Sequence, residues 1–333
     1  MDPQVAAREK SVRSVNVLVV GEALVDVVRD GSALVREHVG GSPLNVAVGL
    51  ARLGVAATLA AHVGVDRRGQ AVRDHLAASG VALEAVGPPG VPTSTAVASL
   101  SAGGAATYEL DVDWNPTFLP DPSRFDMLHV GSIGTVLPSG ANLVRALAEE
   151  AAARAIPVSL DPNVRLSIQP DPSVWRQTFD LLRPAVSHLK MSDEDAAVLF
   201  PGASAQLVAD TLASEGRGRL VALTHGADGA YVASPAGAAQ VVARSSEVVD
   251  TIGAGDAFTA AMLTWSGRRA WPAPGMLDSA DLEDVANFAS HAASITCSRK
   301  GADPPWSHEM VEPTRAATPV RGSRPPGSSA GIR

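Results

Sequence analysis

Short apolar runs alternate with segments of helical periodicity along most of this chain. Val15–Val20 is continuously apolar and ends at Gly21, which is typical of a strand buried on both faces of a sheet. Leu44–Leu53 then places apolar residues at helical spacing and stops at Gly54. The same patterns predict strands at Ala56–Val63, Met127–Val130, Pro157–Leu160 and Leu220–Thr224, and helices at Gly69–Ser79, Ala141–Ala153, Asp193–Leu199 and Ser204–Glu215. This alternation predicts an α/β fold with a mainly parallel sheet flanked by helices on both faces.

Two regions interrupt the alternation. Val25–Val39 has the pattern of a strand, a turn at Asp30 and a second strand, and Thr93–Val112 has the same pattern around Gly103. Paired strands inserted into an α/β chain predict a small antiparallel sheet beside the main body. Such a sheet could serve as a lid over a ligand site, or it could be a surface hairpin that closes a sheet edge.

The two ends of the chain differ from the rest in composition. Residues 1–13 are polar, and the tail from Pro313 is rich in Pro, Gly, Ser and Arg with few apolar residues to bury. We therefore expect a loose N-terminus over 1–13 and one domain over 14–312, whose lid covers about 25–39 and 93–113. A disordered tail would follow over 313–333.

Charge and cysteine content narrow the class of protein. The 333 residues carry a formal net charge of −8, which argues against a nucleic-acid-binding surface. Cys297 is the single cysteine, so neither an intrachain disulfide nor a Cys-rich zinc site can form. The apolar run Val15–Val28 contains Glu22 and Asp26 and is too short to cross a bilayer, and no signal-peptide pattern precedes it. These features predict a soluble, cytoplasmic protein without membrane or nucleic-acid partners.

The segment Val248–Leu263, VVDTIGAGDAFTAAML, carries the strongest chemical signal. Glycines just before a helix leave its first N–H groups unobstructed, and these groups form an anion site with the helix dipole. Asp256 follows at the mouth of this site, where a carboxylate could take the proton of an attacking hydroxyl group. A helix cap beside a simple turn would have the same spacing. The chain has no GxxxxGK[ST] loop, so it is not a P-loop enzyme.

A second segment, Gly40–Gly54 or GGSPLNVAVGLARLG, also combines glycines with the start of a helix. Asn45 would lie in the first helical turn, where its amide could donate to and accept from ligand hydroxyls. A strand-to-helix turn with a capping role is the structural alternative.

Together these two segments resemble the signatures of the ribokinase-like, or PfkB, family of carbohydrate kinases. Gly40–Gly54 resembles the N-terminal signature and Asp250–Leu263 the C-terminal DTxGAGD signature, and the resemblance extends over about residues 15–310. It implies a ribokinase-like fold with a small β-sheet lid, and transfer of the ATP γ-phosphate to a sugar hydroxymethyl group. Asp256 would be the catalytic base, and the amides of Gly253, Ala254 and Gly255 would form the anion hole.

The resemblance also implies the substrate-binding residues. By position they lie in the first strand-turn segment, the GG turn and SLDPNVR, which is similar to the DPNxR segment of fructokinase-like and ketodeoxygluconate-kinase-like members. The implied residues are Asp26, Gly40, Gly41, Asn45, Asp161, Asn163 and Arg165. A carboxylate suits a polyol because it accepts from two hydroxyls, and an arginine suits a phosphate or carboxylate because it binds in bidentate fashion.

ATP, Mg²⁺ and K⁺ are the cofactors that the resemblance implies. The nucleotide-binding residues would be Thr224, Gly226, Gly229, Ser290 and Gly301. Magnesium would be held through water by Asp195 and Glu194 in KMSDED, where Ser192 replaces the Asn and Asp195 the Glu of the family motif N-x-x-E. Potassium would be bound by Asp250, Ile252, Thr296, Arg299 and Gly301. Pro305 replaces a Ser that some members use after this loop, which argues against activation by potassium.

The identity of the acceptor stays open at this level. GEALVD, GGSPLN and DPNVR together favour fructose, and ribose, ketodeoxygluconate or a nucleoside are the alternatives. A nucleoside would need an aromatic platform, for which the lid region offers Tyr108, Trp114 and Phe118. A non-catalytic sugar- or nucleotide-binding sensor is the alternative from another class, and a homodimer through the lid is the expected assembly.

Overall fold

The computed structural model describes residues 15–30, 33–100, 106–216, 218–244 and 247–310 of the chain. Within these residues, nine strands form the main sheet in the order β13-β12-β11-β10-β9-β8-β1-β4-β5. Their bounds are β1 Asn16–Val20, β4 Ala56–Ala61, β5 Ala82–Ala85, β8 Met127–Gly131, β9 Val158–Asp161, β10 His188–Ser192, β11 Leu220–Thr224, β12 Ala230–Ser234 and β13 Gly237–Val241. All neighbouring pairs are parallel except β11–β12 and β12–β13, so the predicted mainly parallel sheet is confirmed.

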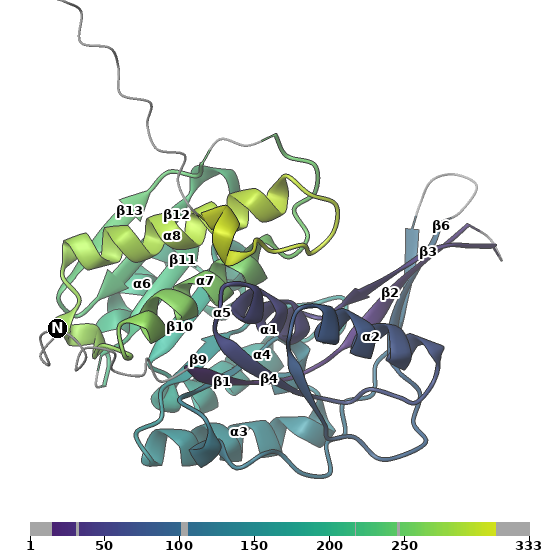
Figure 1. The fold of residues 1–333 in the computed structure, drawn as a ribbon. Coiled ribbons are helices and arrows are strands. Elements are labelled where there is room, and N and C mark those ends of the chain that lie inside the picture. The colour runs from purple at the N-terminus through teal and green to yellow at the C-terminus, as the bar shows by residue number, and fades with distance from the viewer. Residues whose placement is uncertain (1–14, 31–32, 101–105, 217, 245–246, 311–333) are drawn as a thin grey trace, which may run out of the picture.

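Helices cover both faces of this sheet, as the alternation of strands and helices predicts (Figure 1). Their bounds are α1 Ser42–Arg52, α2 Arg67–Ala78, α3 Pro138–Ala153, α4 Pro172–Leu182, α5 Asp193–Leu199, α6 Ala205–Ser214, α7 Ala254–Arg268 and α8 Ser279–Cys297. On β1, Val17 and Val19 belong to the apolar core that includes residues of α1, α2, α7 and α8, whereas Leu18 and Val20 belong to the core that includes residues of α3 to α6. The continuous apolar run of β1 therefore follows from burial on both sides.

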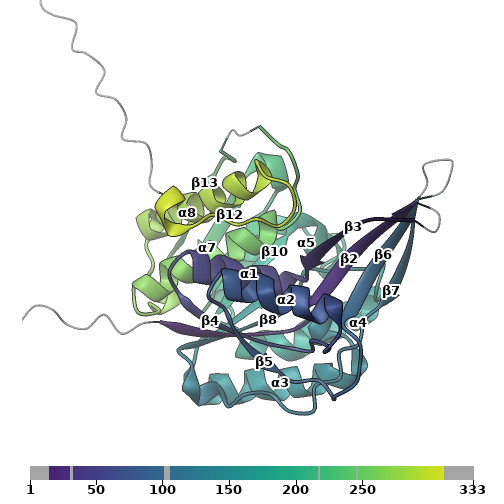
Figure 2. The same ribbon diagram turned by 45° about the vertical axis from the view of Figure 1, so that its right-hand side comes forward.

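A second, smaller sheet stands beside the main body (Figure 2). It contains β2 Leu24–Asp30, β3 Ala33–Gly40, β6 Ser94–Leu100 and β7 Ala106–Asp111 in the order β3-β2-β6-β7. Each predicted hairpin is antiparallel, and the hairpins join through the parallel pair β2–β6. The small sheet is therefore confirmed, although it is mixed and not purely antiparallel. The predicted turn at Gly103, the loose N-terminus and the C-terminal tail lie outside the described residues.

The apolar pattern did not predict six elements of the structure, which are β5, β10, β12, β13, α4 and α8. In β10 the apolar residues Leu189 and Met191 are interrupted by His188 and Lys190, so the strand lacks the apolar run that identified its neighbours. Strands β12 and β13 form an antiparallel hairpin at the edge of the sheet, where the outer strand alternates between covered and exposed positions.

Helices α1 and α7 lie side by side although about 200 residues separate them in the chain. The contact depends on Gly49, because a Cβ atom at this position would lie 2.7 Å from the Cβ of Ala260. This separation is shorter than any ordinary carbon–carbon contact. Glycine at position 49 thus lets the two helices approach closely, and the approach brings their first turns within hydrogen-bonding distance.

We expect Gly49→Ala to lower the free energy of unfolding, because the added methyl group forces α1 away from α7. Overpacking of a core costs about 1–3 kcal/mol, and the helix propensity of alanine returns about 1 kcal/mol of that. Denaturant unfolding measures the difference. The double variant Gly49→Ala/Ala260→Gly moves the methyl group from one helix to the other and should recover the stability of the wild type. A Gly49→Ala protein as stable as the wild type would contradict the close contact.

Candidate active site

The predicted functional residues gather at one edge of the main sheet. Strands β1, β8, β9, β10 and β11 all end at this edge, and α1 and α7 begin there. In parallel sheets this carboxyl end is where ligands bind, because loops and helix N-termini converge on it. Asp161 is the last residue of β9, and Asp256 lies in the first turn of α7.

Asp256 is held by two side chains from the first turn of α1. Ser42 Oγ donates to Asp256 Oδ1 at 2.6 Å, and Asn45 Nδ2 donates to Asp256 Oδ2 at 2.8 Å. Gly253 precedes α7 in the left-handed conformation, with φ of 77°, as a tight turn into a helix requires. Sequence reasoning placed Asn45 toward the ligand, whereas here its amide donates to the carboxylate of Asp256.

Opposing effects set the pKa of Asp256. Burial has the largest effect and leaves the pKa above its ordinary value, although the hydrogen bonds from Ser42 and Asn45 and the nearby charges of Lys190 and Arg165 lower it. The carboxyl group is 9% exposed, so it reaches the site without being open to bulk water. These four partners all favour the ionised form, which is the form a base needs.

Lys190 is one residue of this region for which the sequence predicted no role. It lies on β10, its side chain is 5% exposed, and its Nζ donates to Asp161 Oδ2 at 3.1 Å. The same carboxylate oxygen accepts from Thr259 Oγ1 of α7 at 3.2 Å. A lysine inside a short, otherwise buried strand was the available signal, because lysine is rarely buried without a partner.

The GG turn before α1 is required by close packing. Gly41 has φ of 112°, and a Cβ atom there would lie 2.7 Å from the carbonyl oxygen of Glu22. A Cβ atom at Gly40 would lie 2.6 Å from Asp26 Oδ2. The turn therefore brings Asp26 of β2 next to the segment that leads into Ser42.

Asp26 itself is exposed to solvent on the small sheet, opposite His38 of β3. Desolvation of its carboxyl group by neighbouring atoms raises the pKa of Asp26, and the electrostatic interaction with His38 lowers it. A carboxylate that is exposed at the junction of the two sheets is able to accept hydrogen bonds from a polyol.

Glu22, at the end of β1, is a second group that sequence reasoning left without a role. It is 3% exposed, and its Oε2 accepts from the amide of Gly134 at 3.1 Å. Burial raises its pKa to about 7, against the lowering effect of hydrogen bonds from Ser132 and Gly134. Ser132 has φ of 54°, so the loop after β8 is strained where it meets Glu22.

The DPNVR loop after β9 places its three predicted residues differently. Asp161 is 1% exposed and bonded to Lys190, whereas Asn163 is half-buried in the left-handed region with φ of 41°. Arg165 is exposed and donates to the carbonyl of Val164 at 3.0 Å. Its charge is still close enough to Asp256 to lower the pKa of that group.

Asp195, predicted to act on magnesium through water, is engaged by backbone amides. Its Oδ2 accepts from the amide of Ser192 and its Oδ1 from the amide of Val164, both at 2.8 Å. Ser192 Oγ in turn accepts from the amide of Asp195, which completes a capping box at the start of α5. The role of Asp195 toward magnesium stays a prediction, as does that of the exposed Glu194.

The segments predicted to bind potassium lie side by side. Asp250 Oδ2 accepts from the amide of Gly301 at 2.9 Å, and Asp250 Oδ1 accepts from the amide of Ile252 at 3.1 Å. These bonds lower the pKa of Asp250. The carbonyl of Thr296 accepts from the amide of Arg299, so one compact turn carries both of these residues.

Three of the predicted nucleotide-binding residues lie at the same edge. Thr224 ends β11, and Gly226 and Gly229 form the turn into β12 with φ of 53° and 101°. A Cβ atom at Gly229 would lie 2.0 Å from the carbonyl oxygen of Val241, so this position excludes any larger residue. Ser290 is buried on α8, 7% exposed.

Of the three aromatic residues considered as a nucleoside platform, Trp114 is unsuitable. It is 3% exposed, and its indole N–H donates to the carbonyl of Gly134 at 2.8 Å. It packs against Gly140, where a Cβ atom would clash with its ring. Phe118 is half exposed, and the side chain of Tyr108 lies outside the described residues.

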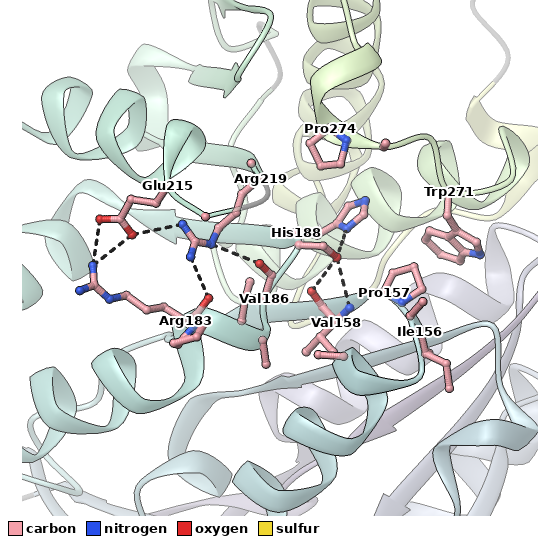
Figure 3. Close-up of a pocket in the computed structure, with 18 of the residues that line it drawn as sticks. Ile156, Pro157, Val158, Arg183, Val186, His188, Glu215, Arg219, Trp271 and Pro274 are labelled. Carbon is pink, nitrogen blue, oxygen red and sulfur yellow. Dashed lines mark hydrogen bonds and ion pairs between the residues drawn. The ribbon is translucent and has the colours of Figure 1, made fainter.

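A cavity of about 840 Å³ lies at the opposite edge of the sheet. Val158, His188 and Arg219, at the amino ends of β9, β10 and β11, line it together with Trp271 (Figure 3). Arg219 is bonded there to Glu215 and to the backbone carbonyls of Leu212, Val186 and Arg183. This cavity lies away from the edge where ligands of parallel sheets bind.

Among the described residues, no group of three or more His, Cys, Asp or Glu side chains is arranged to hold a metal ion. No helix in this part of the chain is long and apolar enough to cross a membrane.

The main sheet and its small companion sheet thus place a buried aspartate at the start of α7. The pfkB family carbohydrate kinase model matches residues 15–309. The chain therefore belongs to this family, and it is a sugar kinase.

Relatives and solved structures agree with this assignment. The fructokinase of Klebsiella pneumoniae is 33% identical over 295 residues, covering 85% of this chain and 94% of its own. The 5-dehydro-2-deoxygluconokinase of Shouchella clausii is 25% identical over 280 residues, which cover 79% of this chain and 81% of that protein. Fructokinase from Vibrio cholerae, in a form with fructose, ADP and calcium ion bound, has a TM-score of 0.71 at 26% identity and covers 87% and 94%.

The buried carboxyl group of Glu22 makes stability depend on pH. Its pKa of about 7 lies above its ordinary value of 4.5, so the stabilisation from its neutral form is complete below pH 4.5 and lost as pH rises through 7. Relative to Glu22→Gln, we expect the wild type to lose roughly 3 kcal/mol of unfolding free energy over this range. Denaturant unfolding of both proteins at several pH values measures it. A difference that is independent of pH would rule out a neutral Glu22.

Proposed function

We propose that this sugar kinase transfers the γ-phosphoryl group of ATP to the hydroxymethyl group of fructose, with Asp256 as general base. The observation that carries the proposal is the environment of Asp256. An aspartate at the start of α7 is held from two sides by Ser42 and Asn45, in the same turn as Gly253 and Gly255. A helix cap alone would not explain this, because the carboxylate bonds to side chains of another helix.

The chemistry follows from this geometry. An ionised carboxylate offers about four acceptor positions, so the two bonds from Ser42 and Asn45 leave positions for an acceptor hydroxyl group. Asp256 removes the proton of that hydroxyl group as its oxygen attacks the γ-phosphorus. The amides of Gly253, Ala254 and Gly255 stabilise the negative charge of the transferring phosphoryl group, since the first amides of a helix have no intrahelical acceptor. The amide of Ala254 donates to the carbonyl of Thr251 over a long 3.3 Å, a bond that it would exchange for one to the phosphoryl group.

The nucleotide would lie between the β11–β12 turn, α8 and the loop that contains Asp250. Thr224, Gly226 and Gly229 border it on one side, and Ser290 and Gly301 on the other. Magnesium bound with ATP neutralises phosphate charge during transfer. The carboxylate of Asp195 already accepts two amide bonds, so we infer that Asp195 and Glu194 act on the metal through water.

Potassium would bind where Asp250 joins the loop at Gly301, with oxygen ligands from Asp250, Ile252, Thr296, Arg299 and Gly301. Two chain segments already meet there through the carboxylate of Asp250. The V. cholerae fructokinase has been solved, as a double mutant, with fructose, ADP and potassium ion bound.

Fructose is favoured because fructokinases are among the similar proteins and because Asp26, Asn163 and Arg165 can supply polar contacts. A ketodeoxy sugar acid is the alternative acceptor, because a 5-dehydro-2-deoxygluconokinase is also among the relatives. Arg165 would then bind the carboxylate of the acceptor. The burial of Trp114 argues against a nucleoside base in its place.

The test is ADP release with fructose, ribose, ketodeoxygluconate and adenosine as acceptors. We expect fructose to give the highest kcat/KM, and Asp256→Asn to lower kcat by the roughly 10²–10⁴-fold of a lost general base. Asp278→Asn is the matched control, because Asp278 caps α8 away from the site and asparagine caps equally well. Full activity of Asp256→Asn would refute the base. Fructose binding without turnover would favour the sensor.

We also propose that two copies pair through the small sheet. Strands β3 and β7 are its edges, and an unpaired strand edge can pair with another chain. Analytical ultracentrifugation should give a dimer, and Val35→Lys on the exposed part of β3 should weaken it. A monomer at all concentrations would contradict this pairing.

A further inference from the structure

Lys190 lies at the centre of the site with no part in the function proposed above. It is the third residue of β10, between Leu189 and Met191, and its side chain is buried. Placing an ammonium group away from water is costly unless charge and hydrogen bonds compensate for it. A buried lysine at the ligand-binding edge of a sheet is therefore expected to serve a specific structural or functional role.

The ammonium group is fixed by neighbours from two other elements. Its Nζ donates to Asp161 Oδ2 of β9, and Thr259 Oγ1 of α7 donates to the same oxygen. Thr259 lies three residues after Asp256, on the adjacent turn of the helix. Lys190 and Asp161 thus link the ends of two strands to the helix that carries Asp256.

The ammonium group of Lys190 also lies against Gly255, in the first turn of α7. A Cβ atom on Gly255 would lie 2.8 Å from Lys190 Nζ, so any side chain at position 255 would displace it. The positive charge therefore lies directly against the first turn of α7, next to Asp256 and behind the amides of the proposed anion hole.

A purely structural ion pair explains this arrangement poorly. Buried pairs add little net stability, because desolvation of both charges offsets their attraction. Within the described residues, Asp161 Oδ1 is buried without a hydrogen-bond partner, and Asp161 Oδ2 is the one oxygen to which Lys190 donates. The pair is therefore incompletely satisfied by the protein, as expected for groups that act on something else.

Several charged groups face Asp256. Lys190 and Arg165 are the cations that lower its pKa, and the carboxyl groups of Glu22 and Asp161 lie close enough to interact with it. Arg165 is exposed and screened by water, whereas Lys190 is buried, so the charge of Lys190 acts more strongly. The carboxyl group of Asp195 also interacts with Lys190.

We propose that Lys190 is a positioning residue of phosphoryl transfer, whose ammonium group, fixed under Gly255 by Asp161, keeps Asp256 ionised and adds positive charge behind the anion hole. This inference rests on the proposed function, since it gives Lys190 its role through Asp256. The group does not touch the substrate; it acts through the carboxylate and the helix turn that do.

The test is the pH dependence of kcat/KM for Lys190→Met, which removes the charge and keeps much of the volume. We expect the acid limb, which reports protonation of Asp256, to move to higher pH by roughly one unit or more, the size typical of a close opposite charge. We expect kcat to fall while the KM for the acceptor changes less. Asp161→Asn removes a negative neighbour, so its acid limb should move to lower pH.

Arg219→Met is the matched control. Arg219 is also a buried cation paired with a carboxylate, but it lies at the far edge of the sheet (Figure 3). Thermal unfolding should show that Arg219→Met is less stable than the wild type. The acid limb of its pH profile of kcat/KM should stay where it is in the wild type. If Lys190→Met does not fold, the double variant Lys190→Met/Asp161→Asn removes both charges of the pair, and comparison with Asp161→Asn alone isolates Lys190.

The outcomes separate the two proposals. A wild type that releases no ADP with any acceptor overturns the proposed function, and the role of Lys190 with it. An active wild type and an active Lys190→Met with the same acid limb overturn the role of Lys190 alone. Equal upward movement of the limb in Arg219→Met would also overturn it, because the effect would then follow from lost stability.

Discussion

The contact between the first turns of α1 and α7 is the constraint on which the site depends. Ser42 and Asn45 reach Asp256 only because Gly49 and Ala260 let the two helices approach within a carbon–carbon contact. Each helix also begins at a glycine with positive φ, Gly41 and Gly253. The site is thus assembled by backbone geometry at four small residues, and its chemistry is carried by three polar ones.

Charge is balanced tightly at the carboxyl edge of the sheet. Burial raises the pKa of Glu22 to about 7 and that of Asp161 to about 6, and it raises the pKa of Asp256 as well. Lys190 counteracts this at Asp161 and Asp256, whereas Glu22 is bonded to a serine and an amide and has no such cation among its partners. Neighbouring carboxyl groups in different environments can therefore hold different protonation states at one pH, which is how acid and base roles are separated in many enzymes.

Much of this architecture could be predicted from the sequence. Short, mainly apolar runs identified β1, β4, β8, β9 and β11, because those strands are buried on both faces, and the two signatures identified the starts of α1 and α7. Strand β10 was missed for the same physical reason, since the polar Lys190 that interrupts it is compensated only in three dimensions, by Asp161 from β9. Trp114 was misjudged because its burial depends on the non-local partners Gly134 and Gly140. The local sequence around Lys190 or Trp114 carries no information about these contacts between distant residues.

The departure of this chain from the family motif at Ser192 and Asp195 has a consistent physical explanation. Serine is a strong N-cap, and an aspartate three residues later closes a capping box with it at the start of α5. The remaining oxygen of Asp195 holds the amide of Val164, which ties the DPNVR loop to the end of β10. Val164 lies three residues after Asp161, and Asp195 lies five residues after Lys190, so this bond holds the ends of β9 and β10 together beside the pair. The altered motif therefore keeps a capping box at the start of α5 and holds the DPNVR loop beside the buried ammonium group.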